Sequence, residues 1–189
     1  MVWKVTGGWF LLTTVVAVRK GGQVEFGCDS QVSWGGRAHH GVAKVVANGC
    51  VTFGFAGSSR ILDIMEFMLI PVRAVGVSDR EWIISVFVPA VLRAVKEVDA
   101  PRVKDGQVDL EGRVILFVGD TLGYLAGNLS FVGEPSGVLG VGSGADFALG
   151  ALAAGASVTR AVEIARELDM YTGGDVTTMK VGSGGVGSV

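Results

Sequence analysis

Several features that mark secreted or membrane-spanning proteins are scarce in this 189-residue sequence. Its two cysteines, Cys28 and Cys50, are too few for a disulfide framework, and we expect both to be buried, reduced thiols. The apolar run at residues 9–18 is too short to span a bilayer, so no transmembrane helix is predicted. A secretory signal peptide needs a basic start, an apolar stretch and a cleavage site with small residues. Residues 1–12 contain only one lysine and a Gly-Gly pair that match these features. These features favour a cytoplasmic protein.

Neither sign of charge dominates. There are 16 Lys and Arg against 18 Asp and Glu, a formal net charge of −2, and the basic residues form no stripe, so we expect no nucleic-acid partner. Proline is scarce, with four residues against 30 glycines, and the apolar fraction of 49% is typical of one globular domain with many tight turns. The mean hydropathy of +0.50 suggests surface that is buried against neighbouring subunits.

The hydrophobic pattern predicts strands first and helices next. Residues 13–56 are rich in Val, Phe and Thr and are broken by Gly-Gly and Asn-Gly turn signals, as in successive hairpins. Helical spacing follows at residues 58–71, and a second helix opens at Ser78 with a capping box closed by Glu81. Pro89 lies inside the second helix, so we expect a kink or a boundary there. The residues expected on the two buried faces are Ile61, Leu62, Met65, Met68 and Leu69, then Ile83, Phe87, Val91, Ala94 and Val95.

The second half of the sequence repeats this alternation. Strands are expected between residues 113 and 141, helices at about 145–156 and from Ser157 onward, and a last strand at 175–181. The order predicts an α+β fold, a four-layer αββα sandwich of two mainly antiparallel sheets flanked by helices. The buried face of the last helix is expected to consist of Val158, Ala161, Val162, Ala165 and Leu168. The expected divisions are a leader at 1–12, a single domain at 13–181 and a Gly/Ser-rich tail at 182–189.

Three other kinds of site have weaker support. Residues 140–145 fit the G-x-G-x-x-A spacing of a dinucleotide site, but the helix after them leads into another helix rather than into a parallel strand. His39 and His40 have no Cys or His cluster nearby in the sequence, so we predict loop residues and no metal site. No G-x-S-x-G motif in a strand-to-helix context supports a Ser-His-Asp hydrolase.

Two threonines at the head of the first predicted hairpin carry the strongest functional signal. Thr13 and Thr14 open an apolar strand, and Asp29 ends the strand after it. A threonine that becomes the first residue of a chain has a nucleophilic hydroxyl beside an α-amine, which titrates at about 7.7–8.0 and can accept the hydroxyl proton. Residues 1–12 precede Thr13 here, so this chemistry requires cleavage of the bond between Leu12 and Thr13.

Six short segments, in order along the chain, carry a family resemblance. They are T-T-V-V-A-V-R at 13–19, G-C-D-S at 27–30, V-A-K-V at 42–45, F-A-G-S at 55–58, V-G-S-G at 141–144 and D-M-Y-T-G-G at 169–174. Together they resemble the proteasome β-type subunits, and most of all the bacterial HslV peptidase, which are N-terminal nucleophile hydrolases. The resemblance covers nearly the whole chain from residue 13 to about 181.

The resemblance implies a role for each matching residue. Thr13 would be the nucleophile, Lys44 would favour the neutral amine and the developing alkoxide through its charge, and Asp29 would orient Lys44. The Gly57 N–H would stabilise the oxyanion. The residues implied to hydrogen-bond the amine and its water are Ser143, Asp169 and Thr172. The residues implied to line the first specificity pocket are Val32, Val42, Val46 and Phe55, and their apolar side chains suggest a preference for apolar substrate residues.

The same resemblance implies how the protein would work as an assembly. It predicts a threonine endopeptidase in a self-compartmentalising homo-oligomeric ring, hexameric or heptameric and either single or stacked. The ring would act on peptides and proteins, with an ATP-dependent unfoldase as partner and without a cofactor. An alternative is an unprocessed, catalytically silent structural or assembly subunit, because a bulky Leu12 precedes Thr13 where active members usually have glycine.

Overall fold

The computed structural model describes residues 13–34, 37–98, 102–104 and 106–182, and two antiparallel sheets face each other at its centre. The leader expected at residues 1–12 lies outside the described residues, as do residues 183–189 of the expected tail. Gly182, which we assigned to that tail, is instead the last residue of strand β13 (Val176–Gly182).

The first sheet has four strands in the order β12 (Val138–Gly142), β1 (Thr14–Lys20), β2 (Gln23–Asp29) and β13, and every pairing is antiparallel. Gly21 and Gly22 form the turn between β1 and β2 with φ angles of 58° and 79°, which glycine adopts without a steric cost. This hairpin pairs Val15 with Cys28, so the start of β1 lies beside the end of β2.

The second sheet has five strands, again with antiparallel pairing. Their order is β11 (Phe131–Gly133), β10 (Thr121–Leu125), β9 (Gly112–Val118), β6 (Val51–Gly57) and β5 (Val45–Asn48). Two separate hairpins are formed by β3 (Val32–Trp34) with β4 (Arg37–His39) and by β7 (Arg102–Lys104) with β8 (Gln107–Asp109). Strand β13 is thus one edge of the first sheet, and β5 is one edge of the second.

The two sheets pack through apolar side chains that alternate along each strand. Val15 and Phe26 from the first sheet meet Val45 and Ile115 from the second in one buried cluster. Gly54 allows the sheets to approach here, because a Cβ at this position would lie 2.5 Å from Val15 Cγ1. Successive residues of the central strands are buried on opposite faces: Val15 packs between the sheets, and Val16 packs against α4 and α5.

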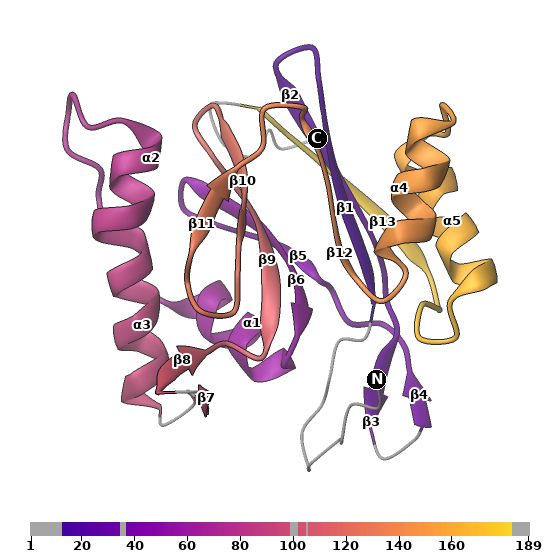
Figure 1. Cartoon of the computed structure of the whole chain (residues 1–189), viewed down its shortest axis with the longest axis horizontal. Coiled ribbons are helices and arrows are strands. Elements are labelled where there is room, and N and C mark those ends of the chain that lie inside the picture. The colour runs from indigo at the N-terminus through magenta and orange to yellow at the C-terminus, as the bar shows by residue number, and fades with distance from the viewer. Residues whose placement is uncertain (1–12, 35–36, 99–101, 105, 183–189) are drawn as a thin grey trace.

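Helices on the outer face of the second sheet form one outer layer (Figure 1). They are α1 (Ser59–Phe67), α2 (Asp79–Trp82), a π-helical turn η1 (Ile83–Phe87) and α3 (Val88–Glu97). Ser78 caps α2 by accepting from the Glu81 N–H at 3.3 Å, as the capping box predicts. Instead of ending at Pro89, the helical segment continues through it. The π-helical turn ends two residues before Pro89. Its wider backbone spacing accommodates the proline ring and the hydrogen bond that the proline cannot donate.

The other outer layer consists of α4 (Ala145–Ala153) and α5 (Val158–Leu168), which cover the first sheet (Figure 1). Ser157 caps α5 by accepting from the Arg160 N–H at 3.2 Å. Gly27 of β2 lets α5 approach closely, because a Cβ there would lie 2.4 Å from Val158 Cγ1. The four layers confirm the predicted αββα sandwich.

Four sequence expectations are wrong at the surface. Leu69 lies beyond the end of α1 and is 92% exposed, and Leu168 ends α5 with 60% of its surface exposed. Cys50 is exposed because it lies in the two-residue turn, Gly49-Cys50, between β5 and β6, whereas Cys28 is buried as expected. His39 lies at the end of strand β4 rather than in a loop.

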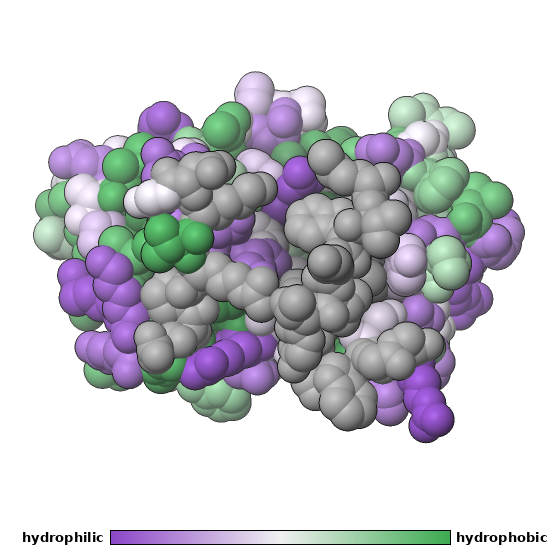
Figure 2. All heavy atoms as spheres, turned by 60° about the horizontal axis from the view of Figure 1, so that its bottom comes forward, coloured by the Kyte–Doolittle hydropathy of each residue, from purple (hydrophilic) through white to green (hydrophobic). Residues whose placement is uncertain are grey.

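Hydrophobic and hydrophilic side chains are interspersed on the face shown in Figure 2. The connection between α1 and α2 leaves Leu69, Val72 and Val75 almost fully exposed. Within the part of the chain that the structure describes, no helix has the length and hydropathy needed to cross a membrane.

Candidate active site

Three buried polar side chains meet where the two sheets come together. Thr13, Asp29 and Lys44 each have 0% relative exposure. Lys44 Nζ lies 2.8 Å from Asp29 Oδ1. The Thr13 hydroxyl donates to Asp29 Oδ1 and accepts from Lys44 Nζ, so each member of the cluster contacts the other two. A buried charge pair with this connectivity is unlike the exposed ion pair that these residue types usually form.

Different strands supply the three residues. Thr13 directly precedes β1, and Asp29 is the last residue of the adjacent strand β2. Lys44 directly precedes β5 of the other sheet, and its carbonyl accepts from the Phe55 N–H at 2.9 Å. Because β5 is paired with β6, Lys44 is held at the edge of the second sheet while its side chain reaches the first.

Backbone N–H groups fix the Asp29 carboxylate. Its Oδ1 accepts from the Thr14 N–H at 2.9 Å, and its Oδ2 accepts from the N–H groups of Gln31 at 3.1 Å and Gly173 at 2.9 Å. With Lys44 and the Thr13 hydroxyl, both carboxylate oxygens are bonded in a region closed to solvent. The five donors lie on both oxygens and hold the carboxylate in one orientation.

Burial lowers the pKa of the Lys44 ammonium from its ordinary value, 10.5, and the charge and hydrogen bond of Asp29 act in the opposite direction. The proton on Nζ is therefore held less tightly than on an exposed lysine. A group of this kind beside a hydroxyl can stabilise a developing alkoxide or exchange a proton with it closer to neutral pH.

A second hydrogen-bond network lies next to this cluster. Asp169 Oδ2 accepts from the hydroxyls of Ser143 and Thr172, each at 2.6 Å. Thr172 Oγ1 also lies 2.8 Å from Thr14 Oγ1, which is fully buried. The network thus joins the exposed Ser143 to the second residue of the threonine pair. The structure brings together Ser143, Asp169 and Thr172, and their catalytic roles remain predictions.

Backbone contacts hold the carbonyl side of Thr13. Its oxygen accepts from the Gly144 N–H at 3.3 Å. Gly142, with φ of 102°, passes so close that a Cβ there would lie 1.9 Å from this oxygen. Gly57, the predicted oxyanion residue, ends β6 with φ of 149°, and a Cβ there would lie 2.3 Å from the Glu111 carbonyl oxygen. Glycine is therefore required at Gly57 and Gly142 for steric reasons.

The four predicted specificity residues gather on the side of the second sheet that faces α1 and α3. Val32, Val46 and Phe55 are buried there in one hydrophobic cluster, and the half-buried Val42 packs against it. Their role in binding a substrate remains a prediction.

The structure also bears on the alternatives. Strand β12, which precedes the G-x-G-x-x-A turn, pairs antiparallel with β1, and α4 leads into α5, so the turn lacks the parallel crossover of a dinucleotide site. His39 and His40 are both exposed. Among the described residues, no group of three or more His, Cys, Asp or Glu side chains is placed to hold a metal ion.

Three residues of the site's hydrogen-bond networks were not predicted from the sequence. Thr14 completes the second network, and the N–H groups of Gln31 and Gly173 bind Asp29. Thr14 could have been found, since it is adjacent to the nucleophile candidate in a polar pair that opens an otherwise apolar strand. The Gln31 N–H leaves no signal in side-chain identity, whereas Gly173 lies in the D-M-Y-T-G-G segment at 169–174.

Comparison with known proteins gives a fold but no sequence family. No protein-family model matches the sequence. Two structures of BPH from Thiobacillus denitrificans, one in complex with epoxomicin, have 21% identity and TM-scores of 0.73 and 0.74, with 90% of this chain and 98% of BPH covered. Eukaryotic HslV from Trypanosoma brucei has 24% identity and a TM-score of 0.61, with 89% of this chain and 98% of that chain covered. The likeness extends over almost the full length of each protein.

Proposed function

We propose, on the premise that this chain has the HslV and proteasome β-type fold, that it is a threonine endopeptidase subunit whose nucleophile is Thr13. The observation that carries the proposal is the buried contact of the Thr13 hydroxyl with both Lys44 and Asp29. A threonine with only a structural role has no need of a charged pair at its hydroxyl, because burying two ions costs several kcal/mol each.

The proposed reaction begins after the bond between Leu12 and Thr13 has been cut. The freed α-amine of Thr13 takes the hydroxyl proton, and Oγ attacks the carbonyl carbon of the scissile peptide bond. The Lys44 ammonium stabilises the alkoxide that develops on Oγ, and the Gly57 N–H is proposed to bind the substrate oxyanion. The leaving amine takes the proton from the α-amine as the acyl-enzyme forms.

Water then hydrolyses the acyl-enzyme. The α-amine accepts a proton from the attacking water and returns it to Oγ when the ester bond breaks, which restores the free threonine. Ser143, Asp169 and Thr172 are proposed to hold the amine and this water. The short hydrogen bonds that both hydroxyls donate to Asp169 support this role, because they fix the direction of each hydroxyl.

We further propose that subunits form a homo-oligomeric ring that confines hydrolysis and receives peptides and unfolded proteins from an ATP-dependent unfoldase. The exposed Leu69, Val72 and Val75 support contact with a neighbour, because exposed apolar residues in one segment are unfavourable in a monomer. Val32, Val42, Val46 and Phe55 are proposed to form the pocket for an apolar substrate residue.

The second candidate function is that of an unprocessed, catalytically silent subunit. It is favoured by the bulky Leu12 before Thr13, because a large side chain hinders attack of the Thr13 hydroxyl on its own preceding carbonyl. In that state the Thr13 nitrogen is an amide and cannot act as a base.

Intact-mass measurement of the purified protein, followed by a peptide hydrolysis assay, separates the two functions. The peptidase predicts a species that begins at Thr13, hydrolyses an apolar peptide substrate and gains the mass of one epoxomicin per chain. The matched variant Thr13→Ala should lose hydrolysis and keep the same oligomeric state. A chain that stays full length and neither hydrolyses nor reacts excludes the peptidase.

A further inference from the structure

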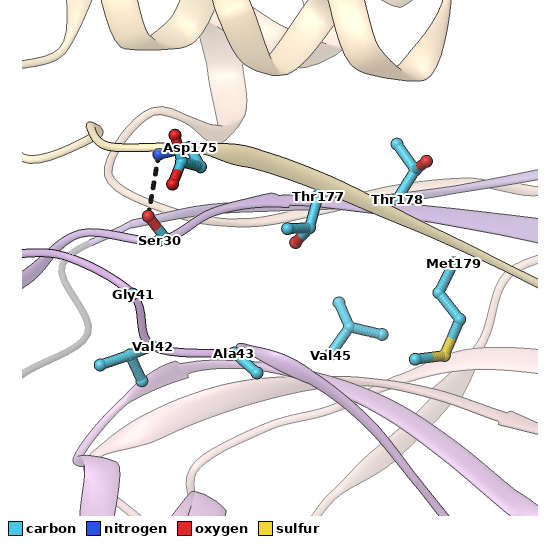
Figure 3. Close-up of a pocket in the computed structure, with 9 residues that line it drawn as sticks. All are labelled: Ser30, Gly41, Val42, Ala43, Val45, Asp175, Thr177, Thr178 and Met179. Atoms are coloured by element: carbon cyan, nitrogen blue, oxygen red, sulfur yellow. Dashed lines mark hydrogen bonds between the residues drawn. The ribbon is translucent and has the colours of Figure 1, made fainter.

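A cavity of about 310 Å³ lies at the open edge of the sandwich, between the edge strand β13 and the segment at residues 41–45 that leads into β5 (Figure 3). Ligand sites in proteins have volumes of roughly 300–1,000 Å³, so this cavity is suited to a small molecule or to a single side chain. The described residues that line it are Ser30, Gly41, Val42, Ala43, Val45, Asp175, Thr177, Thr178 and Met179.

The two ends of the cavity differ in polarity. Val45 and Met179 point into the space between the two strands, and Thr177 also points toward it, whereas Thr178 points away (Figure 3). Asp175 and Ser30 lie together at the opposite end. A ligand that fills the cavity must therefore be apolar along most of its length and polar at one tip.

The polar end favours a hydrogen-bond donor. Ser30 Oγ accepts from the Asp175 N–H at 2.9 Å and retains a second lone pair for a ligand. Among the described lining residues, Asp175 alone is ionisable, and no hydrogen bond or ion pair ties its carboxylate to another described residue. The nearby charge of Lys44 does not compensate Asp175, because Lys44 is already paired with Asp29 at 2.8 Å.

A histidine borders this end and has to be considered. A Cβ at Gly174 would lie 2.4 Å from Ser30 Oγ and 2.7 Å from His40 Nδ1, so the imidazole lies close to the hydroxyl. His40 is therefore a neighbour of the polar end, and at pH 8 an alkylamine carries its proton.

We propose that this cavity binds a primary ammonium group on a short aliphatic stem. The stem would lie between Val45 and Met179, and the ammonium would donate to Asp175 and Ser30. A lysine side chain of a peptide and a small alkane diamine share this chemistry. Binding here requires no cut at Thr13, because Thr13 does not line the cavity.

Methyl NMR of the full chain, labelled at Val and Met methyl groups, tests the proposal at pH 8. On titration with n-pentylamine, the Val45 and Met179 methyl signals should shift with a common saturation curve. 1-Pentanol should bind several-fold more weakly, and pentanoate more weakly still, because Asp175 repels it. Since Asp175 is exposed, Asp175→Asn should weaken the binding of n-pentylamine by about two- to fivefold. Asp63→Asn removes an equal charge from the exposed face of α1 and should leave the affinity for n-pentylamine unchanged.

A steric variant keeps the proposal refutable without relying on charge. Ala43→Leu should fill the cavity and abolish saturable binding, whereas Ala47→Leu, at another exposed alanine close by, should not. Saturable binding that survives Ala43→Leu, or pentanoate binding as well as the amine, overturns the proposal. Absence of saturable shifts in the unmodified protein also overturns it.

Two further probes identify the source of the ammonium group. Tighter binding of Nα-acetyl-lysine methylamide than of 1,5-diaminopentane assigns the cavity to peptide lysines. The reverse order assigns it to a free diamine. If neither probe binds and n-pentylamine does not bind either, the cavity is not an ammonium site.

Discussion

Replacement of Asp29 by asparagine is the sharpest test of the buried cluster. The change keeps the shape of the side chain but removes the charge that balances Lys44. In either orientation of the amide, its NH₂ group faces N–H donors: those of Gln31 and Gly173 on one side, or Thr14 and Lys44 on the other. Both the charge balance and the hydrogen bonding of the site are therefore lost.

The expected loss is large. Removing one partner of a buried ion pair costs about 3–5 kcal/mol, because the other charge remains buried without compensation. A domain of this size typically has about 5–15 kcal/mol of net stability, so Asp29→Asn should remove a large part of it. Removing both charged groups with Asp29→Asn/Lys44→Met should cost less than the sum of the two single substitutions, because neither charge is then left unpaired.

Urea unfolding at one fixed protein concentration measures these changes, since the stability of an oligomer depends on concentration. The same strand provides the control. Glu25 of β2 lies 4.0 Å from Lys180, and their side chains are 33% and 67% exposed, so Glu25→Gln should cost less than about 1 kcal/mol. If Asp29→Asn costs no more than Glu25→Gln, the cluster is not closed to water, and the reasoning is refuted.

The same variant has a predicted pH dependence. Asp29 raises the pKa of Lys44 against the effect of burial, so Asp29→Asn should lower that pKa further. Between the lowered folded pKa and the ordinary value of 10.5, the unfolded chain binds more protons at Lys44 than the folded chain does. Stability of the variant should therefore rise with pH across this window. Unfolding curves that are independent of pH there would contradict a Lys44 whose pKa is lowered by burial.

Three further predictions concern single positions. Thr14→Val should remove the bond to Thr172 and lower the free energy of unfolding by about 1 kcal/mol, whereas Thr14→Ser should retain it, as measured by urea unfolding. Gly144→Ala should cost about 1–3 kcal/mol in the same assay, because its Cβ would lie 2.1 Å from Thr14 Oγ1; a neutral effect would refute the close packing. Thiol titration of the native protein should label Cys50 and spare Cys28, because burial also raises the pKa of the Cys28 thiol; loss of rapid labelling in Cys28→Ser, rather than in Cys50→Ser, would reverse this assignment.

Much of the fold could be predicted because the strands are rich in Val, Phe and Thr, whereas apolar residues recur at helical spacing in the helices. The Gly-Gly turn and the Ser78 and Ser157 caps mark element ends directly in the sequence, whereas the Asn-Gly signal lies one residue before the Gly49-Cys50 turn. The end of α1 could not be predicted, since Met68 and Leu69 continue the helical spacing beyond Phe67. Hydropathy alone does not show where the backbone leaves the helix.

The candidate site was less accessible to prediction. The resemblance pointed to Thr13, Asp29 and Lys44, but only the register of β1 with β2 and the pairing of β5 with β6 show that their side chains meet. Exposure of Cys50 could have been inferred from the turn signal just before it. The polarity of the cavity at β13 depends on residues from both edges of the sandwich, which no local pattern connects.

The contacts that hold the Thr13 carbonyl have a consequence for how the protein would be activated. Gly144 binds this oxygen and Gly142 packs against it, while the Thr14 N–H is bonded to Asp29. All of these contacts lie on the C-terminal side of the bond that precedes Thr13. Cutting that bond would therefore leave the Thr13 hydroxyl in place, so activation in the proposed mechanism would free the α-amine without moving any of the described strands.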